Sequence, residues 1–241
     1  MVHFVTESGV DVPAVDAATM REVDRIAVEE FGLEILQMME NAGRALARHA
    51  SMLGHAATGP VVVLAGGGNN GGGGLCCARH LHNHGVTVRV VLDRAPERLH
   101  DLARHQWHIL QAAGFTPVPR ERAAQALQEA VVIVDALIGY GLQGPPRAIA
   151  AELIHACNAA NAPVLSLDVP SGLHTDGADM SGPVVRAHRV LTLALPKPAL
   201  AHIDAEFFLA DIGIPPEVYA RLGIPYIPPF GGEDWVRLHS R

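Results

Sequence analysis

Short apolar runs separated by amphipathic stretches dominate the chain from residue 61 onward. The runs are rich in valine, leucine and isoleucine, as is typical of strands buried on both faces. They predict strands at Val61–Ala65, Thr87–Leu92, Phe115–Val118, Val131–Val134, Val164–Leu167, Val190–Ala194 and Glu206–Ala210. Helical patterns fill most of the gaps, including Glu97–Ala113 and Arg147–Ala160. This alternation predicts an α/β fold with a mostly parallel central sheet and helices on both of its faces.

Two helices are predicted before the first strand, within residues 1–56. Asp16 is a suitable N-cap for the first, whose apolar residues recur at helical spacing. Gly32 breaks the pattern, and a second helix follows from Glu34 to Leu53. Small residues on its apolar face, Ala42 and Gly43, would allow close packing on a sheet or on another subunit.

The last residues, 224–241, contain a proline-rich stretch, Ile224-Pro225-Tyr226-Ile227-Pro228-Pro229-Phe230. Proline excludes regular helix and central strand there, so we expect this segment to form an arm across the domain. No internal repeat or low-complexity linker divides the 241 residues. A single domain over residues 1–241 is the simplest prediction.

Composition narrows the class of protein. Apolar residues make up 49% of the chain and charged residues 18%, which suits a well-packed α/β protein rather than a disordered chain. The net charge of −7, without a long basic run, argues against nucleic acid as a partner. No apolar stretch approaches ~20 residues, which argues against a membrane span.

The cysteines and histidines give little sign of a disulfide framework or a metal site. The three cysteines are an odd count without framework spacing, which indicates reduced thiols in a cytoplasmic compartment. The first residues also lack the pattern of a secretion signal. His80, His82 and His84 alternate along a predicted helix and do not share one face, so we interpret them as surface residues.

A glycine-rich loop follows the first predicted strand. Seven of the nine residues in Gly66–Gly74 are glycine, and Asn69 and Asn70 lie among them. The segment Leu75–His84 behind the loop has a helical pattern. Glycines let bare backbone N–H groups approach a ligand, and a helix N-terminus favours negative charge. This loop is therefore the best candidate for a ligand site, with phosphate as a natural guest.

Two later strands are each followed by an aspartate and a glycine-bearing loop. Asp135 follows Val131–Val134, and Asp168 follows Val164–Leu167. In a parallel sheet both lie at the same edge as the glycine loop, where ligands of such sheets bind. Asn70, Asp135 and Ser171 can then converge as oxygen ligands of a hard cation. With a single carboxylate in this set, a monovalent ion is favoured over magnesium or zinc.

Two other interpretations of these segments stay open. Strand-end aspartates often only cap the helix that follows. The glycine loop also fits G-x-G-x-x-G as Gly66, Gly68 and Gly71, with Asp93 placed to bind a ribose hydroxyl, although so many glycines satisfy many such patterns. The Lys-Ser/Thr of a Walker loop and a G-x-S-x-G nucleophile elbow are both missing.

Taken together, the segments resemble the NAD(P)H-hydrate epimerase family, also called the YjeF N-terminal domain family. The resemblance covers nearly the whole chain and rests on motifs in matching order. They are Met39-Glu40-Asn41-Ala42-Gly43, Gly68-Asn69-Asn70-Gly71-Gly72 with Ala78-Arg79-His80-Leu81, Val134–Leu142, Asp168-Val169-Pro170-Ser171-Gly172-Leu173 and Asp211-Ile212-Gly213-Ile214-Pro215.

The resemblance implies a Rossmann-like three-layer αβα sandwich, commonly dimeric. It implies an isomerase that interconverts the R and S forms of hydrated NADH and NADPH, which carry a hydroxyl at C6 of the nicotinamide ring. A separate dehydratase then repairs the S form. Asn70, Asp135 and Ser171 would bind one potassium ion per subunit. The substrate would contact Asn69, Asn70, Gly71, Gly72, Gly73, Gly139, Tyr140, Gly141, Leu142, Gln143, Gly144, Pro145 and Asp168.

Epimerisation at C6 requires the hydroxyl to leave and water to return on the other face. A carboxylate near C6 can protonate the leaving hydroxyl, stabilise the cation and deprotonate the returning water. Asp168 is the first candidate for this catalytic role, and Asp135 is the second because the ion would occupy it.

The sequence departs from the family pattern at the glycine loop. Gly73 stands where the family usually has aspartate, and Gly67 replaces a frequent proline. The segment around Lys197 is also shorter than in many members, which leaves this lysine without a role. Three function classes therefore stay open. They are an epimerase, a catalytically weakened ligand-binding or scaffold member of the family, and an NAD(P)-dependent oxidoreductase suggested by the glycine fingerprint and Asp93.

Overall fold

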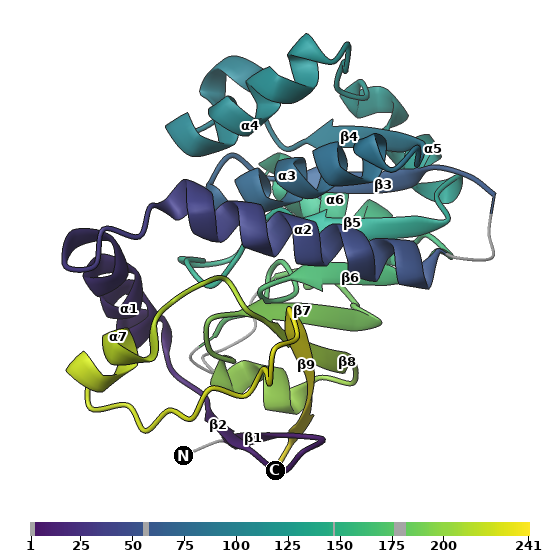
Figure 1. Ribbon diagram of the computed structural model, residues 1–241. Coiled ribbons are helices and arrows are strands. Elements are labelled where there is room, and N and C mark those ends of the chain that lie inside the picture. The colour runs from purple at the N-terminus through teal and green to yellow at the C-terminus, as the bar shows by residue number, and fades with distance from the viewer. Residues whose placement is uncertain (1–2, 55–57, 147, 176–181) are drawn as a thin grey trace.

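The computed structural model describes residues 3–54, 58–146, 148–175 and 182–241, and in this part of the chain a nine-stranded sheet crosses the molecule (Figure 1). The strand order is β2-β1-β9-β8-β7-β6-β5-β3-β4. The strands are β1 (His3–Thr6), β2 (Asp11–Pro13), β3 (Val61–Ala65), β4 (Val88–Leu92), β5 (Val132–Ala136), β6 (Val164–Leu167), β7 (Arg189–Leu193), β8 (Glu206–Ala210) and β9 (Trp235–Ser240).

The strands from β3 to β8 are all parallel, whereas β9, β1 and β2 continue the sheet in antiparallel order beyond β8. The connection from β3 to β4 runs to one side and the path from β3 through β5 to β8 runs to the other. The strand order therefore reverses between β3 and β5, and the carboxyl ends of these strands frame a crevice.

Helices cover both faces of the sheet. They are α1 (Ala17–Glu29), α2 (Ile35–Leu53), α3 (Asn69–Asn83), α4 (Asp101–Ala112), α5 (Ala123–Gln128), α6 (Ala148–Asn158) and α7 (Pro216–Arg221). Alternate residues of β3 enter two separate cores, because side chains of a strand point to opposite faces. Val61 and Val63 pack with α1 to α4, and Val62 and Leu64 pack with α5 and α6. The predicted three-layer α/β fold is confirmed.

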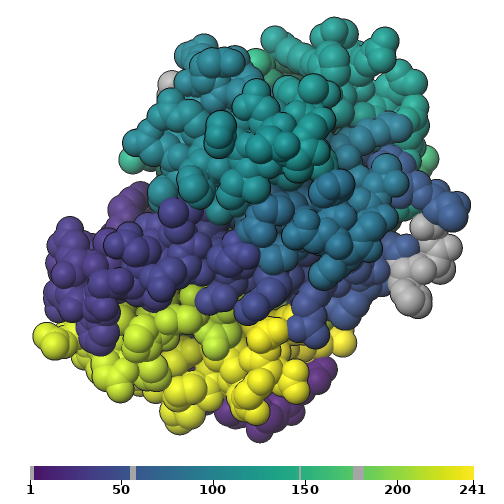
Figure 2. Space-filling view, turned by 45° about the horizontal axis from the view of Figure 1, so that its top comes forward, coloured from purple at the N-terminus to yellow at the C-terminus, as the bar shows by residue number. Residues whose placement is uncertain are grey.

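The two ends of the chain meet in the sheet and not in a separate arm. β9 lies between β8 and β1, and Arg48 of α2 bonds Asp234 at 2.6 Å. Figure 2 shows the N-terminal helices in purple beside the C-terminal residues in yellow. The prediction of an irregular arm holds for 224–230 but is wrong for Trp235–Ser240, which contains no proline and can therefore join the ladder.

One predicted strand is absent. Phe115–Val118 lies beside β4 but forms no strand, and it keeps a single ladder-like bond from the Val118 N–H to the Val90 carbonyl at 2.8 Å. Pro117 and Pro119 flank Val118, and proline cannot donate to a ladder, so pairing stops after this bond.

The predicted helix boundaries differ most at the glycine loop. α3 begins at Asn69, six residues before the predicted Leu75, so four glycines lie in its first turns. α4 begins at Asp101 rather than Glu97, after a short 3-10 turn. Asp16 caps α1 as predicted, accepting a bond from the Thr19 N–H at 2.8 Å. The predicted start of α6, at Arg147, lies outside the described residues.

The glycines of this segment serve packing inside the protein. A Cβ on Gly66 would lie 1.9 Å from the Leu137 carbonyl oxygen, and one on Gly71 would lie 1.7 Å from the Gly66 carbonyl oxygen. On α2, a Cβ on Gly43 would lie 2.5 Å from Cys76 of α3. The small-residue face of α2 is therefore used within the chain, against α3. In the described part of the chain, no helix combines the length and apolarity that a membrane crossing needs.

Gly66→Ala tests this packing, with Gly68→Ala as the matched control in the same loop. Alanine at 66 forces the β3 and β5 loops apart, because the obstacle is backbone, and we expect a loss of about 1–3 kcal/mol in the free energy of unfolding in urea. A Cβ on Gly68 meets nothing within 4 Å, so that variant should unfold like the parent. Equal stability of the two variants would contradict the close approach.

Candidate active site

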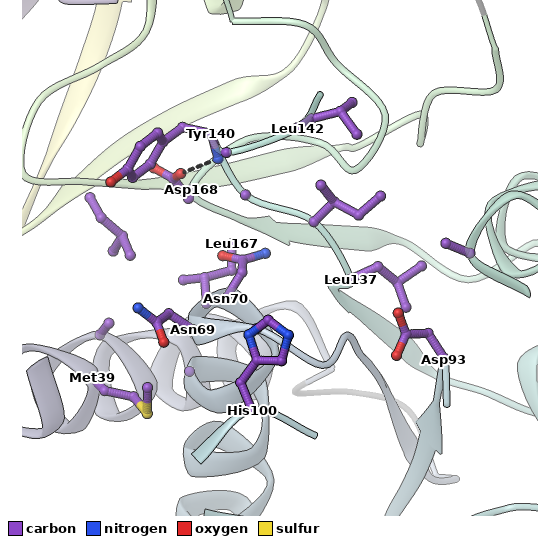
Figure 3. A pocket seen from close by; sticks show the side chains of 18 of the residues that line it. Met39, Asn69, Asn70, Asp93, His100, Leu137, Tyr140, Leu142, Leu167 and Asp168 are labelled. Carbon is purple, nitrogen blue, oxygen red and sulfur yellow. Dashed lines mark hydrogen bonds between the residues drawn. The ribbon is translucent and has the colours of Figure 1, made fainter. Parts of the chain in front are cut away.

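A cavity of about 1080 Å³ opens at the carboxyl ends of the parallel strands, where the strand order reverses (Figure 3). This volume is at the upper end of the range for small-molecule binding sites. The walls come from the start of α3, the loops after β4, β5 and β6, the segment after β7, and the helices α1 and α2. The topology thus gathers residues that are far apart in sequence around one space.

Asn70 contributes an amide with an unused hydrogen-bonding atom to the cavity wall. Its Nδ2 is buried and has no partner among the described residues. The position that a Cβ on Gly139 would take is 3.2 Å from the Asn70 Oδ1 and 3.2 Å from the Asp168 Oδ2. A side chain at 139 would therefore press against both the amide and the carboxylate. An unpaired buried amide beside a cavity points to a ligand.

Asp168 forms a buried ion pair with Lys197. The Lys197 ammonium donates to the Asp168 Oδ1 and, at 3.0 Å, to the Leu193 carbonyl oxygen. The exposed fractions of the two side chains are 5% for Asp168 and 1% for Lys197. The second carboxylate oxygen, Oδ2, accepts the Tyr140 N–H at 3.0 Å. Asp168 has a φ of +68°, a left-handed conformation that costs about 1–3 kcal/mol outside glycine and often marks a functional site.

A second polar pair, formed by Tyr140 and Asp24, lies beside the Asp168–Lys197 ion pair. The Tyr140 hydroxyl donates to the Asp24 Oδ2 of α1 at 2.5 Å, and the Lys197 ammonium is 5.6 Å from the centre of the Tyr140 ring. Burial raises the pKa of Asp24, although the Tyr140 bond and the Lys197 charge oppose this shift. Burial and the Asp24 charge raise the pKa of Tyr140, so the phenol stays protonated at neutral pH.

Asp135 lies behind the cavity wall and is completely buried. It accepts the Ser171 hydroxyl at 2.5 Å, the Ser171 N–H at 2.8 Å, the Ser166 hydroxyl at 2.8 Å and the Leu137 N–H at 3.3 Å. Burial raises the pKa of Asp135, and these four bonds oppose the rise. The Ser171 hydroxyl also lies 3.3 Å from the Ile138 carbonyl oxygen.

The donor types of this group suit a weakly charged cation, although each Asp135 oxygen already accepts two hydrogen bonds. Asn70 lies beside Gly139, and the Ser171 hydroxyl accepts the N–H of Ile138, the residue before Gly139. Asn70 and Ser171 therefore contact the same short segment after β5, and Asp135 bonds Ser171. The donor set offers one carboxylate, one hydroxyl, an amide and a backbone carbonyl. It contains no thiol or imidazole, which agrees with a hard monovalent ion rather than zinc.

The other side of the cavity carries a guanidinium. Arg94 donates to both carboxylate oxygens of Asp93, at 2.8 and 2.9 Å, at the end of β4. A Cβ on Gly67 would lie 2.4 Å from the Arg94 Nε, so the guanidinium rests directly on the glycine loop. Asp93 lies across the cavity from Asp168 (Figure 3). The carboxylate predicted to bind a ribose hydroxyl is thus occupied by Arg94.

Most of the residues proposed from sequence to contact substrate line the cavity: Asn69, Asn70, Gly73, Gly139, Tyr140, Gly141, Leu142, Gln143, Pro145 and Asp168. Gly71, Gly72 and Gly144 are not among the lining residues, nor are Asp135 and Ser171. At Gly73, a Cβ would lie 2.7 Å from the Leu167 Cδ2. The space that the family's aspartate would enter is therefore taken by the end of a leucine side chain.

Sequence reasoning gave no site role to Asp24 or Lys197, and it did not consider Arg94. Asp24 had a usable signal, because it lies four residues after Met20 and three before Ala27 and so shares the buried face of α1. Lys197 had a usable signal, because a lysine between two prolines after a buried strand is placed where it can be enclosed. Arg94 directly follows Asp93 at the end of a predicted strand, so its guanidinium is placed to pair with that carboxylate.

Comparisons with known proteins point to the same family as the sequence motifs. Residues 35–199 match the family described as YjeF-related protein N-terminus. The NAD(P)H-hydrate epimerase of Dehalogenimonas lykanthroporepellens is 44% identical over 242 residues, which cover 98% of this chain and 97% of that protein. The protein of the same name from Truepera radiovictrix is 34% identical, covering 92% of this chain and 99% of that protein.

Two further similarities concern a longer protein and the fold. The bifunctional NAD(P)H-hydrate repair enzyme Nnr of Salinibacter ruber is 38% identical over 87% of this chain, but only 42% of that enzyme is covered. The crystal structure of yeast ynu0, YNL200c, superposes with a TM-score of 0.83 at 24% identity, over 94% of this chain and all of that one. The chain belongs to the YjeF-related N-terminal family.

Proposed function

We propose that this protein is an NAD(P)H-hydrate epimerase, which interconverts the R and S epimers of NADHX and NADPHX. The observation that carries the proposal is the buried Asp168–Lys197 pair on the wall of a large cavity at the strand-order reversal. Support also comes from the names of relatives that match nearly the full chain. The bifunctional relatives favour functional coupling to a dehydratase.

The chemistry that fits this site is acid–base catalysis at C6 of the nicotinamide ring. The ring nitrogen expels the C6 hydroxyl, which takes up a proton from the hydrogen-bonded Asp168–Lys197 pair and leaves as water, and the ring becomes an iminium cation. Water then adds to either face of C6 and returns the proton. The Asp168 carboxylate stabilises the cation and accepts that proton, and the Lys197 ammonium holds the carboxylate in place. Asp135 is enclosed by four donors, so a direct catalytic role for it is not proposed.

Potassium is the cation we propose for Asn70, Asp135 and Ser171. Its support is the Asn70 Oδ1, an acceptor that lies beside Gly139, and the low charge of the donor set. An ion there would fix the loop after β5, whose Gly139 and Tyr140 line the cavity next to Asp168. Its proposed role is to hold this wall in shape.

We propose that the adenosine end of the substrate lies toward Arg94. A guanidinium there suits a phosphate, and Arg98 of the same cavity wall adds a second positive charge. Because Arg94 occupies Asp93, the carboxylate does not repel a 2′-phosphate. This arrangement favours acceptance of NADPHX as well as NADHX.

The two alternative functions have less support. The oxidoreductase loses the ribose contact on which it rested, because both carboxylate oxygens of Asp93 are bonded by Arg94. A weakened or scaffold member of the family is suggested by Gly73, yet the Asp168–Lys197 pair and the cavity are both intact. A homodimer remains our expectation from the family resemblance, and a cytoplasmic location remains our expectation from the cysteine pattern.

A coupled assay tests the proposed activity. Purified R-NADHX is supplied with a dehydratase specific for the S form, and recovery of NADH should accelerate when this protein is added. Asp168→Asn should lower the rate by about 10²- to 10⁴-fold, the usual contribution of a general acid–base group. Asp234→Asn, at an exposed aspartate, is the control. Absence of acceleration by the parent protein would overturn the epimerase.

Loss of folding is separable from loss of chemistry. Removing one partner of a buried ion pair costs about 3–5 kcal/mol, so Asp168→Asn also destabilises. The double variant Asp168→Asn with Lys197→Met leaves no unpaired charge, and its asparagine tolerates the left-handed conformation and keeps an acceptor for the Tyr140 N–H, so it should regain most of the stability. It should stay inactive in the coupled assay. Recovery of activity in this double variant would exclude the carboxylate from the reaction.

Potassium should stabilise the protein and accelerate the assay more than sodium does. At tenfold excess over its Kd a bound ion adds about 1.4 kcal/mol, or a few °C in Tm. Asn70→Ala should remove the potassium-dependent rise in Tm. Asn83→Ala, at the exposed end of the same helix, should keep it. An unchanged potassium response in Asn70→Ala would contradict this ion site.

Arg94→Ala should discriminate between the two substrates. Loss of a charged hydrogen bond to the 2′-phosphate costs about 1.5–3 kcal/mol, or about 10- to 100-fold in kcat/KM for NADPHX. The value for NADHX should fall less, because that substrate lacks the phosphate. A parallel fall for both substrates would place the adenosine end elsewhere while leaving the epimerase proposal intact.

A further inference from the structure

A group of metal-binding side chains lies between α2 and α3, outside the cavity. Glu40 comes from α2, and Cys76 and His80 are four residues apart on α3 and so share a face. The His80 Nε2 lies 2.8 Å from the Glu40 Oε1, and the Cys76 Sγ lies 3.3 Å from the Glu40 Oε2. None of the three lines the cavity, and the reaction does not use them.

The spacing of these atoms suits a tetrahedral ion. One ligand atom from each side chain lies within 4.8 Å of the other two. Zinc bonds of about 2.0–2.3 Å place tetrahedral ligands roughly 3.3–3.8 Å apart, so small side-chain movements close the site. A thiolate, an imidazole and a carboxylate are the three donor types that zinc binds, and the thiolate selects against magnesium and calcium.

The site already attracts a cation. The Arg79 guanidinium donates to the Glu40 Oε2 and, at 3.3 Å, to the Cys76 Sγ. It is incompletely bonded, because its buried Nε has no partner among the described residues. Its side chain is 21% exposed, so a path to water is open. A divalent ion that displaces Arg79 would therefore break an imperfect set of bonds.

An ion can reach the group from the surface, but it must displace a thiol proton to bind. The Glu40 side chain is 43% exposed and that of His80 is 15% exposed, so an ion reaches the group from the surface. Cys76 is buried, and it is fixed against α2 where a Cβ on Gly43 would lie 2.5 Å from its Sγ. Burial and the Glu40 charge raise the pKa of the Cys76 thiol to about 12, so binding at neutral pH must expel one proton.

We infer that Glu40, Cys76 and His80 form a zinc site, with a water molecule as fourth ligand, that fastens α2 to α3. The two joined helices carry Met38 and Met39 on one side of the cavity and Asn69 and Asn70 on another. Bound zinc therefore stabilises the cavity walls without touching the substrate. The inference is independent of the proposed epimerase activity.

Metal titration of the full chain tests the site. The protein is stripped with chelator under reducing conditions and titrated with Zn²⁺ alone. We expect one ion per chain, release of one proton measured by calorimetry in two buffers, and a higher Tm. Co²⁺ in place of Zn²⁺ should give a thiolate charge-transfer absorption in the near ultraviolet. No uptake, or uptake without this absorption, would overturn the site.

Three variants test the thiol ligand and the competing guanidinium. Cys76→Ala should weaken zinc binding by at least ~100-fold, since even residues behind a ligand account for about 10- to 100-fold. Cys157→Ala removes another buried thiol, on α6, and should bind zinc like the parent. Arg79→Ala should bind zinc more tightly, because the competing cation is gone, and a merely structural role of the group would not give this result. Parental affinity in Cys76→Ala, or weaker affinity in a folded Arg79→Ala, would contradict the inference.

Discussion

The buried pair of Asp168 and Lys197 is the interaction on which the site depends. It joins the end of β6 to the segment after β7, two parts of the chain that the sheet places side by side. Lys197 also bonds the Leu193 carbonyl oxygen, and Asp168 also receives the Tyr140 N–H. A left-handed aspartate and a buried lysine are each unfavourable alone, and each is tolerated because the other compensates it.

The pair also sets the electrostatics of the surrounding wall. The Tyr140 hydroxyl donates a hydrogen bond to Asp24 next to the Lys197 ammonium. Burial raises the pKa of Tyr140, so the phenol stays protonated. Two carboxylates and one ammonium thus line one end of the cavity, while Arg94, paired with Asp93, lies at the other. A ligand with an uncharged or cationic ring at one end and a phosphorylated tail at the other would match this distribution of charge.

The glycine segment illustrates how packing, rather than ligand contact, can require glycine. Gly66, Gly71 and Gly74 each face protein atoms closer than a Cβ allows, so α3 lies directly against the β3 and β5 loops. This close approach brings Asn70 beside Gly139 and Asp168. The same helix packs on α2 through Cys76 and Gly43, which links the cavity to the side chains at the helix interface.

The sequence by itself determined the α/β class, most of the parallel strands and the placement of the glycine loop, Asp135 and Asp168 at one edge of the sheet. It could do so because buried strands have a local apolar pattern and because parallel strands share one carboxyl edge. Only the tertiary structure decided that Asp135 is enclosed behind the wall, that Lys197 reaches Asp168 and that Asp24 of α1 joins the site. It also decided that β9 completes the sheet. These features depend on contacts between residues far apart in the chain, and such contacts leave no periodic trace in the local sequence.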